Sequence, residues 1–109
     1  MADVPLEITV EEYARMRKAG EPHTLLDVRE PHELDISKLA GSLDIPMGQV
    51  ADRASELPDD ATIVVLCRTG GRSMKVTRWL RQNGYDKATN LGGGINAWAQ
   101  RIDTSLRQY

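Results

Sequence analysis

One short stretch in the middle of the chain constrains the fold more than any other. Residues 63–66 read Ile-Val-Val-Leu, an apolar and mostly β-branched run, and they lead directly into Cys67, the only cysteine among the 109 residues. A run of this length and composition is typical of a buried strand. The amphipathic stretch 73–83 that follows favours a helix. Cys67 is therefore expected in the loop that connects a strand to a helix.

The same alternation of apolar runs and amphipathic stretches extends along the chain. Strands that alternate with helices through short connections favour a parallel sheet that helices cover on both faces. We therefore predict an α/β fold with a central parallel sheet of about five strands. The expected strands are 8–9, 24–28, 43–45, 62–66 and 88–90. The expected helices are 9–20, 31–36, 47–57, 73–83 and 93–100, the first of them opened by a Thr9 and Glu12 capping box.

Length and composition indicate one domain with one hydrophobic core. We assign residues 1–109 to this domain, with a core from about residue 8 to 100 and a tail over 101–109. Trp79 and Trp98 are expected to anchor the core, and the first seven residues lack the basic start and apolar stretch of a signal peptide. The longest apolar run, 63–67, is far too short for a membrane span. We therefore expect a soluble, cytoplasmic protein without a membrane partner.

The charges are unevenly distributed along the chain. Residues 1–60 hold 14 acidic and 6 basic side chains, whereas 61–109 hold 2 acidic and 8 basic ones. The cysteine lies in the basic half, and such asymmetry steers anions towards a site. Lys75, Arg78 and Arg81 are expected to form an ordinary solvated helix face. A small anion, and not a nucleic acid, is the partner that this pattern favours.

Few residues are available for metal or redox chemistry. One cysteine excludes an internal disulfide and a cysteine-rich zinc site. His23 and His32 lie in polar surroundings without ligand spacing and are expected to be solvated. We therefore expect neither a metal nor an organic cofactor.

The loop that follows the cysteine has the composition of an anion site. Gly70 and Gly71 remove the side chains that would stop several backbone N–H groups from converging on the sulfur. Arg68, Arg72 and the positive end of the next helix favour thiolate over thiol. Cys67 is thus predicted to be an activated nucleophile, reachable from solvent, with main-chain hydrogens aimed at its sulfur. The alternative is a buried structural cysteine. The predicted loop comprises Arg68, Thr69, Gly70, Gly71, Arg72 and Ser73.

From about Ile8 to Trp98 the chain resembles the single-domain rhodanese-like sulfurtransferases. The motifs that carry the resemblance are Leu25-Leu26-Asp27-Val28-Arg29 with Glu33, Gly41-Ser42 leading to Ile45-Pro46, the loop from Cys67 to Arg72, and Asn90-Leu91-Gly92-Gly93-Gly94-Ile95 with Trp98. The resemblance implies that Cys67 carries a transferable sulfur as a persulfide. The sulfur would come from a small thiosulfate-like donor and pass to a thiol, cyanide or protein acceptor.

Three groups of residues are expected to support this loop. Asp27 would accept loop N–H or arginine hydrogen bonds, and Arg29 with Glu33 would form a local ion pair. The glycine triplet 92–94 would pack its backbone closely against the cysteine loop. At Lys38 and Leu39 the chain departs from the family pattern, which often has a histidine before an isoleucine there. In the family that histidine generally supports the fold.

Two other functions remain open from the sequence. A cysteine phosphatase or arsenate reductase uses a similar loop, but four residues separate Cys67 from Arg72 here, and the phosphatase loop has a fifth. The shorter loop suits a single sulfur atom better than a phosphoryl group. A sulfur-delivery or docking module for a protein partner, in a ubiquitin-like sulfur carrier pathway, is the second alternative. The tail 103–109 is faintly similar to the end of rhodanese-like domains fused to adenylating enzymes, and would otherwise be a frayed terminus.

Overall fold

The computed structural model describes residues 4–109. Within this range one sheet holds five strands in the order β1-β5-β4-β2-β3, and each neighbouring pair is parallel. The strands are β1 (Glu7–Ile8), β2 (Thr24–Asp27), β3 (Leu43–Asp44), β4 (Ile63–Leu66) and β5 (Ala88–Leu91). The predicted α/β class with a parallel sheet is confirmed, and every strand lies within one residue of its expected bounds.

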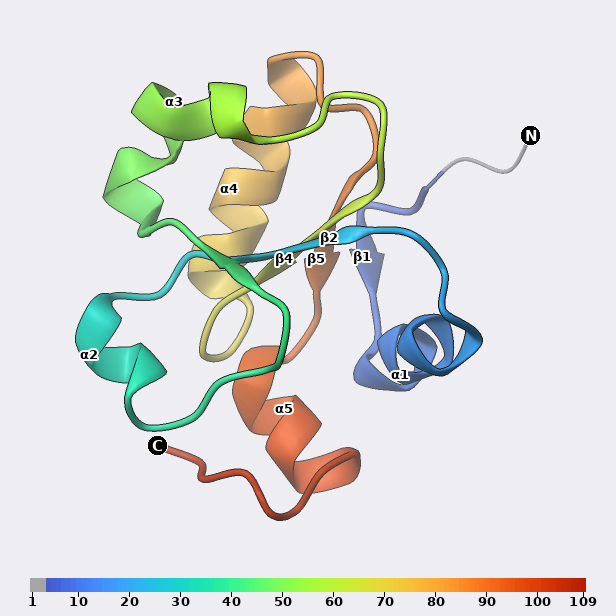
Figure 1. Cartoon of the computed structure of the whole chain (residues 1–109), viewed down its shortest axis with the longest axis vertical. Coiled ribbons are helices and arrows are strands. Elements are labelled where there is room, and N and C mark those ends of the chain that lie inside the picture. The colour runs from blue at the N-terminus through green and yellow to red at the C-terminus, as the bar shows by residue number, and fades with distance from the viewer. Residues whose placement is uncertain (1–3) are drawn as a thin grey trace.

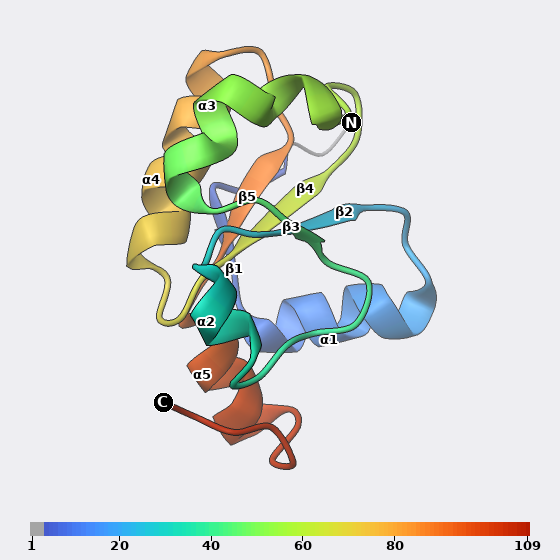
Figure 2. The same cartoon turned by 60° about the vertical axis from the view of Figure 1, so that its left-hand side comes forward.

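Helices cover both faces of the sheet (Figure 1 and Figure 2). On one face lie α1 (Val10–Ala19) and α5 (Gly94–Arg101), and on the other α3 (Val50–Arg53) and α4 (Gly71–Gln82). Successive side chains of a strand point to opposite faces. In β4, Ile63 and Val65 therefore pack with α3 and α4, while Val64 and Leu66 pack with α1 and α5. This fully buried strand delivers Cys67 to the carboxyl edge of the sheet.

The first helix begins and ends where the sequence predicts. The Thr9 hydroxyl accepts the Glu12 N–H at 3.1 Å, and the Thr9 N–H donates to the Glu12 carboxylate at 3.0 Å. Gly20, at φ 68°, closes the helix in the left-handed region that glycine adopts without strain. Tyr13 of α1 is fully buried, and its ring lies 5.6 Å from that of Trp98. This contact makes α1 a support for α5.

The predicted helices 47–57 and 73–83 differ from the observed ones. The stretch 47–57 is not one helix but three short pieces, η1 (Met47–Gln49), α3 and η2 (Ala54–Glu56). Gln49 and Arg53, at φ −107° and −111°, interrupt the helical geometry at the joints. Gly48, which loses more backbone freedom in a helix than other residues, lies in the first piece. α4 begins at 71 rather than 73, because Gly70, at φ 106°, leads into the helix from the left-handed region.

The short segment between β2 and β3 shows how the chain replaces the expected histidine and isoleucine. It contains α2 (Pro31–Leu34), which is shorter than the expected 31–36. Leu39 is only 4% exposed and belongs to the hydrophobic cluster that includes Trp98. Lys38 is exposed and forms an ion pair with Asp44. Leu39 thus fills the core, and Lys38 holds the segment against β3 through its ion pair.

The described residues contain no membrane helix and no metal cluster. Within 4–109, no helix has both the length and the apolar character needed to cross a membrane. Over the same residues, no three His, Cys, Asp or Glu side chains are grouped so that they could hold a metal ion. His32 is exposed, as expected. The prediction for His23 is wrong, because this ring is half-buried and its Nε2 lies 2.8 Å from the Tyr13 hydroxyl.

Candidate active site

The cysteine sulfur lies at the bottom of the loop between β4 and α4. Its Sγ accepts a hydrogen bond from the Gly70 N–H at 3.0 Å and another from the Ser73 hydroxyl at 3.1 Å. Gly70 adopts φ 106°, a conformation that other residues rarely take and that leads the chain from the loop into α4. The sequence predicts several amides here. In the structure one amide and one hydroxyl hold the sulfur.

The sulfur is also less open than the sequence predicts. Cys67 is only 1% exposed and belongs to the hydrophobic cluster that contains Val65 and Val76. The prediction of a sulfur that solvent reaches freely is therefore wrong. Arg68 and Thr69, in contrast, are exposed at the rim of the loop. Any reagent for this sulfur must be slim enough to pass that rim.

The N-terminus of α5 fixes the back of the loop. The Ile95 N–H donates to the Cys67 carbonyl at 2.9 Å, and the Asn96 N–H donates to the Arg68 carbonyl at 3.1 Å. In a trans peptide the C=O and the following N–H point in opposite directions. The N–H groups of Arg68 and Thr69 consequently point away from α5. This orientation keeps carbonyl oxygens from lining the side of the loop that faces an incoming anion.

The glycine triplet permits this close approach. At Gly94, a Cβ atom would lie 2.4 Å from the Arg68 carbonyl oxygen and 2.5 Å from the Cys67 oxygen. Gly94 also adopts φ 62°, which adds strain for any other residue. The expectation that the triplet packs its backbone against the cysteine loop is confirmed. Only a residue without a side chain fits where α5 meets the loop.

Asn90 supports the loop in a way that its place in the sequence motif does not indicate. Its side-chain amide donates to the Gly70 carbonyl at 3.2 Å and to the Glu7 carboxylate at 2.7 Å. Asn90 is 1% exposed at the end of β5. By holding the Gly70 carbonyl, it fixes the peptide between Gly70 and Gly71, which follows the peptide whose N–H meets the sulfur.

The second loop arginine forms an ion pair with α2. Arg72 donates to both carboxylate oxygens of Glu33, at 2.6 and 2.8 Å. The Glu33 side chain is 8% exposed and that of Arg72 is 33% exposed. The hydrogen bond from Arg72, opposed by burial and assisted by Tyr109, lowers the pKa of Glu33 to about 2. Glu33 thus stays ionised and neutralises one of the two loop cations.

Arg29 pairs with Asp27 and not with Glu33, so the expected local ion pair is wrong. Nε and Nη2 of Arg29 both donate to Asp27, the latter at 2.8 Å, and both side chains are fully buried. The remaining donors reach the Glu33 carbonyl at 3.2 Å and the Ser37 carbonyl at 2.8 Å. Burial opposes the charge of Arg29, but its hydrogen bonds outweigh burial and raise its pKa. The pair therefore fixes the backbone around α2, which in turn presents Glu33 to Arg72.

The tail is docked beside the loop and is not a frayed terminus. The Tyr109 hydroxyl donates to Glu33 at 2.6 Å and accepts from Arg29 at 3.0 Å. Its main-chain N–H and carbonyl hydrogen bond the Asn96 side chain at 3.3 and 2.8 Å. The guanidinium carbon of Arg68 lies 4.9 Å from the centre of the Tyr109 ring. In the sequence, one feature indicates this arrangement: the faint similarity of residues 103–109 to the end of rhodanese-like domains that are fused to adenylating enzymes.

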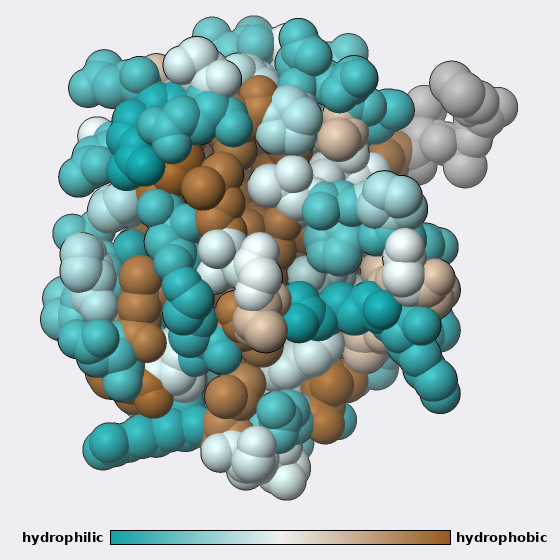
Figure 3. Space-filling view, in the orientation of Figure 1, coloured by the Kyte–Doolittle hydropathy of each residue, from teal (hydrophilic) through white to brown (hydrophobic). Residues whose placement is uncertain are grey.

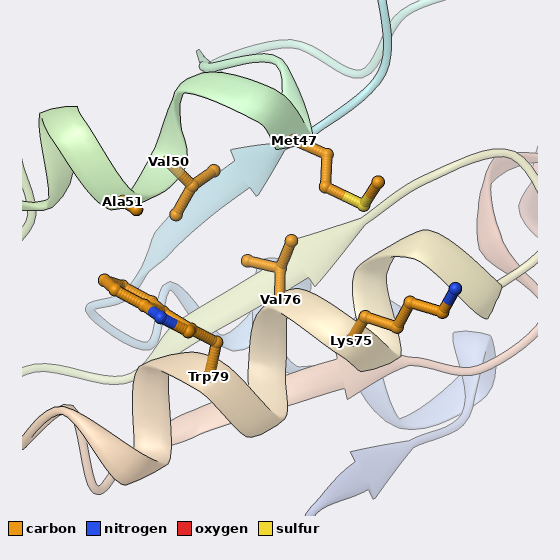
Figure 4. A pocket seen from close by; sticks show the side chains of 6 residues that line it. All are labelled: Met47, Val50, Ala51, Lys75, Val76 and Trp79. Atoms are coloured by element: carbon orange, nitrogen blue, oxygen red, sulfur yellow. The ribbon is translucent and has the colours of Figure 1, made fainter.

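An apolar groove of about 200 Å³ opens between α3 and α4 (Figure 4). Hydrophobic residues gather on the face of the molecule shown in Figure 3, framed by hydrophilic ones. Met47, at 37% exposure, is the one large hydrophobic side chain of residues 4–109 that is exposed. Trp79 lines the groove and is partly buried, packed against the edge of the core and not within it. Trp98 is 7% exposed, as expected of a core anchor. The lining residues are Met47, Val50, Ala51, Lys75, Val76 and Trp79.

The fold and the cysteine loop define the class of protein. The family model described as the rhodanese-like domain matches residues 9–101. The chain therefore belongs to the rhodanese-like domain family.

Named relatives place the chain further within this family. It is 37% identical to a sulfurtransferase of Allochromatium vinosum, over 86% of this chain and 88% of that protein. It is 34% identical to the adenylyltransferase and sulfurtransferase MOCS3-2 of Zea mays, over 94% of this chain but 23% of that protein. The chain thus spans about a quarter of the length of the plant relative. The crystal structure of a rhodanese-like domain protein from Staphylococcus aureus superimposes with a TM-score of 0.82 at 28% identity, covering 96% of this chain and 99% of that one.

Proposed function

We propose that this protein is a sulfurtransferase that carries a sulfane sulfur on Cys67 as a persulfide. The observation that supports the proposal most directly is the pair of hydrogen bonds from the Gly70 N–H and the Ser73 hydroxyl to Sγ. Donors of this kind favour a sulfur anion over a neutral thiol. The similarity to the Allochromatium vinosum sulfurtransferase, which extends over nearly the whole of both chains, supports the same activity.

In the first half of the proposed reaction, the Cys67 thiolate attacks the outer sulfur of thiosulfate. A new S–S bond forms on Sγ, the S–S bond of the donor breaks, and sulfite leaves with the electron pair. Negative charge is conserved, since thiolate and thiosulfate become persulfide anion and sulfite. Arg68 is exposed at the rim, where its charge favours entry of the donor and departure of the leaving anion.

In the second half, a thiophilic acceptor attacks the outer sulfur of the persulfide. The acceptor forms a bond to that sulfur, the S–S bond to Sγ breaks, and the thiolate of Cys67 is restored. Cyanide would give thiocyanate, and a thiol would give a new persulfide. Because Cys67 is 1% exposed, the acceptor must be a small molecule or the slender end of a larger one. Covalent catalysis of this kind divides the transfer into two simple displacements.

Intact-mass analysis after incubation with thiosulfate tests the proposal. Wild-type protein is expected to gain the mass of one sulfur and to lose it on addition of cyanide, with release of thiocyanate. Cys67→Ser is expected to do neither, and Ser55→Ala, at an exposed serine outside the cysteine loop, serves as the control that keeps the thiol. Sulfur transfer that survives in Cys67→Ser would overturn the mechanism. Cysteine-dependent hydrolysis of an aryl phosphate by a protein that takes up no sulfur would favour the phosphatase alternative.

Delivery of sulfur to a protein acceptor is a second candidate. Its support is the similarity to the plant adenylyltransferase and sulfurtransferase, in which the matching segment is a minor part of a longer protein. A protein with a flexible, narrow terminus would satisfy the access limit set by the loop rim. Persulfide-loaded protein that transfers its sulfur to such a terminus faster than to cyanide would favour delivery over free-standing catalysis.

A further inference from the structure

Tyr109 connects two parts of the site that are far apart in the sequence. Its hydroxyl bonds Glu33, the carboxylate that neutralises Arg72, and its ring lies under the guanidinium of Arg68. The two arginines of the cysteine loop are therefore both linked to this one side chain, Arg68 directly and Arg72 through Glu33.

The stack on the ring limits where the Arg68 charge can lie. Arg68 is exposed, and a long exposed side chain ordinarily samples many rotamers, so fixing it in one place costs conformational entropy. A cation over an aromatic ring is attracted to the electron-rich face of that ring. The 4.9 Å separation lies within the range of this interaction. Tyr109 thus offsets part of the conformational entropy that is lost when Arg68 is held in one place.

The ring is itself held firmly enough to serve as a platform. The Tyr109 hydroxyl has partners on both sides, Glu33 at 2.6 Å and Arg29 at 3.0 Å. The Tyr109 backbone is fixed by two hydrogen bonds to Asn96, which also caps the Arg68 carbonyl through its own N–H. Asn96 therefore positions both the backbone of Arg68 and Tyr109, whose ring lies beneath the Arg68 side chain.

We propose that Tyr109 is a positioning residue that holds Arg68 at the loop rim and thereby sets the preference of the site for doubly charged sulfur donors. The inference rests on the proposed sulfur transfer to Cys67. Because Glu33 neutralises Arg72 and Asp27 neutralises Arg29, the net positive charge of this cluster is that of Arg68. A donor with two negative charges, such as thiosulfate, gains more from a fixed Arg68 than a donor with one.

The test compares thiosulfate with methanethiosulfonate, a donor of the same outer sulfur with one negative charge. For Tyr109→Leu we expect the KM for thiosulfate to rise about 5-fold to 10-fold, the KM for methanethiosulfonate to rise less than 3-fold, and kcat to change little. Tyr109→Phe keeps the ring and is expected to keep the KM for thiosulfate within about 2-fold. Arg107→Ala removes a nearby exposed charge of the tail and is the control for a general charge effect.

A double-mutant cycle separates positioning from a merely structural role. Arg68→Ala should raise the KM for thiosulfate as Tyr109→Leu does, and the double variant should be no worse than Arg68→Ala alone. Additive effects on KM would overturn the proposal, because Tyr109 would then act independently of Arg68. Equal rises in KM for both donors would overturn it too, since the effect would not depend on donor charge.

A second readout is independent of sulfur transfer. Alkylation of Cys67 by iodoacetate, an anion, and by iodoacetamide, which is neutral, gives a rate ratio that reports the positive potential at the rim. Tyr109→Leu and Arg68→Ala should lower this ratio to the same value, and the double variant should lower it no further. An unchanged ratio in Tyr109→Leu would refute the positioning role. Failure of wild type to load sulfur would refute the proposed function alone, since the alkylation ratio would still report on Tyr109.

Discussion

Replacement of Glu33 by Gln removes the charge that neutralises Arg72 while it keeps the shape of the side chain. The carboxylate accepts two hydrogen bonds from Arg72, one from the Tyr109 hydroxyl and one from the Glu30 N–H. A glutamine has a single acceptor oxygen, so it cannot preserve all of these bonds. The substitution is therefore expected to destabilise the contact between α2 and the cysteine loop.

The pKa of Glu33 gives the size and the pH range of this effect. The fall from the ordinary value of 4.5 to about 2 corresponds to roughly 3 kcal/mol, at about 1.4 kcal/mol for each pKa unit. Because the pKa is lower in the folded protein, this stability is fully present above pH 4.5. It decreases as the pH falls below 4.5 and is absent near pH 2, where the folded protein is also protonated. For a domain of this size the loss at pH 7 corresponds to a Tm lower by roughly 10–15 °C.

Urea unfolding of wild type and Glu33→Gln at pH 7, 5, 4 and 3 measures the prediction. Glu56→Gln is the matched control, since Glu56 accepts two hydrogen bonds from Arg53 in a similar forked pair that is exposed. We expect the control to change the free energy of unfolding little. The difference between wild type and Glu33→Gln should be constant from pH 7 to 5 and shrink towards pH 3. An undiminished difference at pH 3, or one no larger than that of the control, would refute the reasoning.

Three further substitutions test other parts of the site. Gly94→Ala should lower the free energy of unfolding by roughly 2–4 kcal/mol and abolish sulfur loading, because its Cβ would lie 2.4 Å from a loop carbonyl oxygen. The control is Gly20→Ala, at a similar φ of 68° but with nothing within 4 Å of the added Cβ, which should lower the free energy of unfolding by about 1 kcal/mol and leave sulfur loading intact. Ser73→Ala should slow alkylation of the cysteine by about 10-fold with little loss of stability, since a hydrogen bond to an anion is worth about 1.5–3 kcal/mol, and an unchanged rate would contradict a role for this hydroxyl. Arg29→Met should lower the free energy of unfolding in urea by about 3–5 kcal/mol, because Asp27 would be left buried without its charged partner and only the main-chain N–H of residue 29 would still donate to it. Adding Asp27→Asn should recover part of that loss, and a double variant less stable than the single one would contradict this account.

The sequence predicts the sheet well because the signals that specify it are local. The run 63–66 is apolar, 24–28 is apolar except for Thr24 and Asp27, and turn residues lie outside both. Because the connections between elements are also short, the strands and their parallel arrangement follow. The capping box at Thr9 and the stop at Gly20 likewise involve neighbouring residues. The prediction of one continuous helix over 47–57 is wrong. The buried positions there have helical spacing, but spacing alone does not report the interruptions at Gln49 and Arg53.

The partners of the charged residues could not be predicted in the same way. Glu33 lies four residues from Arg29 and was expected to pair with it, since local pairs are the ones that spacing suggests. Its actual partner is Arg72, which is 39 positions away and reaches it only once β2 and β4 lie side by side. The number of amides at Cys67 was overestimated for a related reason. Composition shows that glycines permit convergence, but the direction of each N–H depends on the contacts of the loop with α5 and Asn90.

These long-range pairs change the electrostatic meaning of the loop. Summed along the sequence, Arg68 and Arg72 give two positive charges beside the sulfur, enough to favour almost any anion. In the folded protein Glu33 cancels one of them, and the remaining cation lies on a tyrosine from the last position of the sequence. The charge that a donor meets is therefore set less by the cysteine motif than by what the rest of the chain places around it. Two chains with the same cysteine loop should consequently prefer different donors when their residues at 33 and 109 differ.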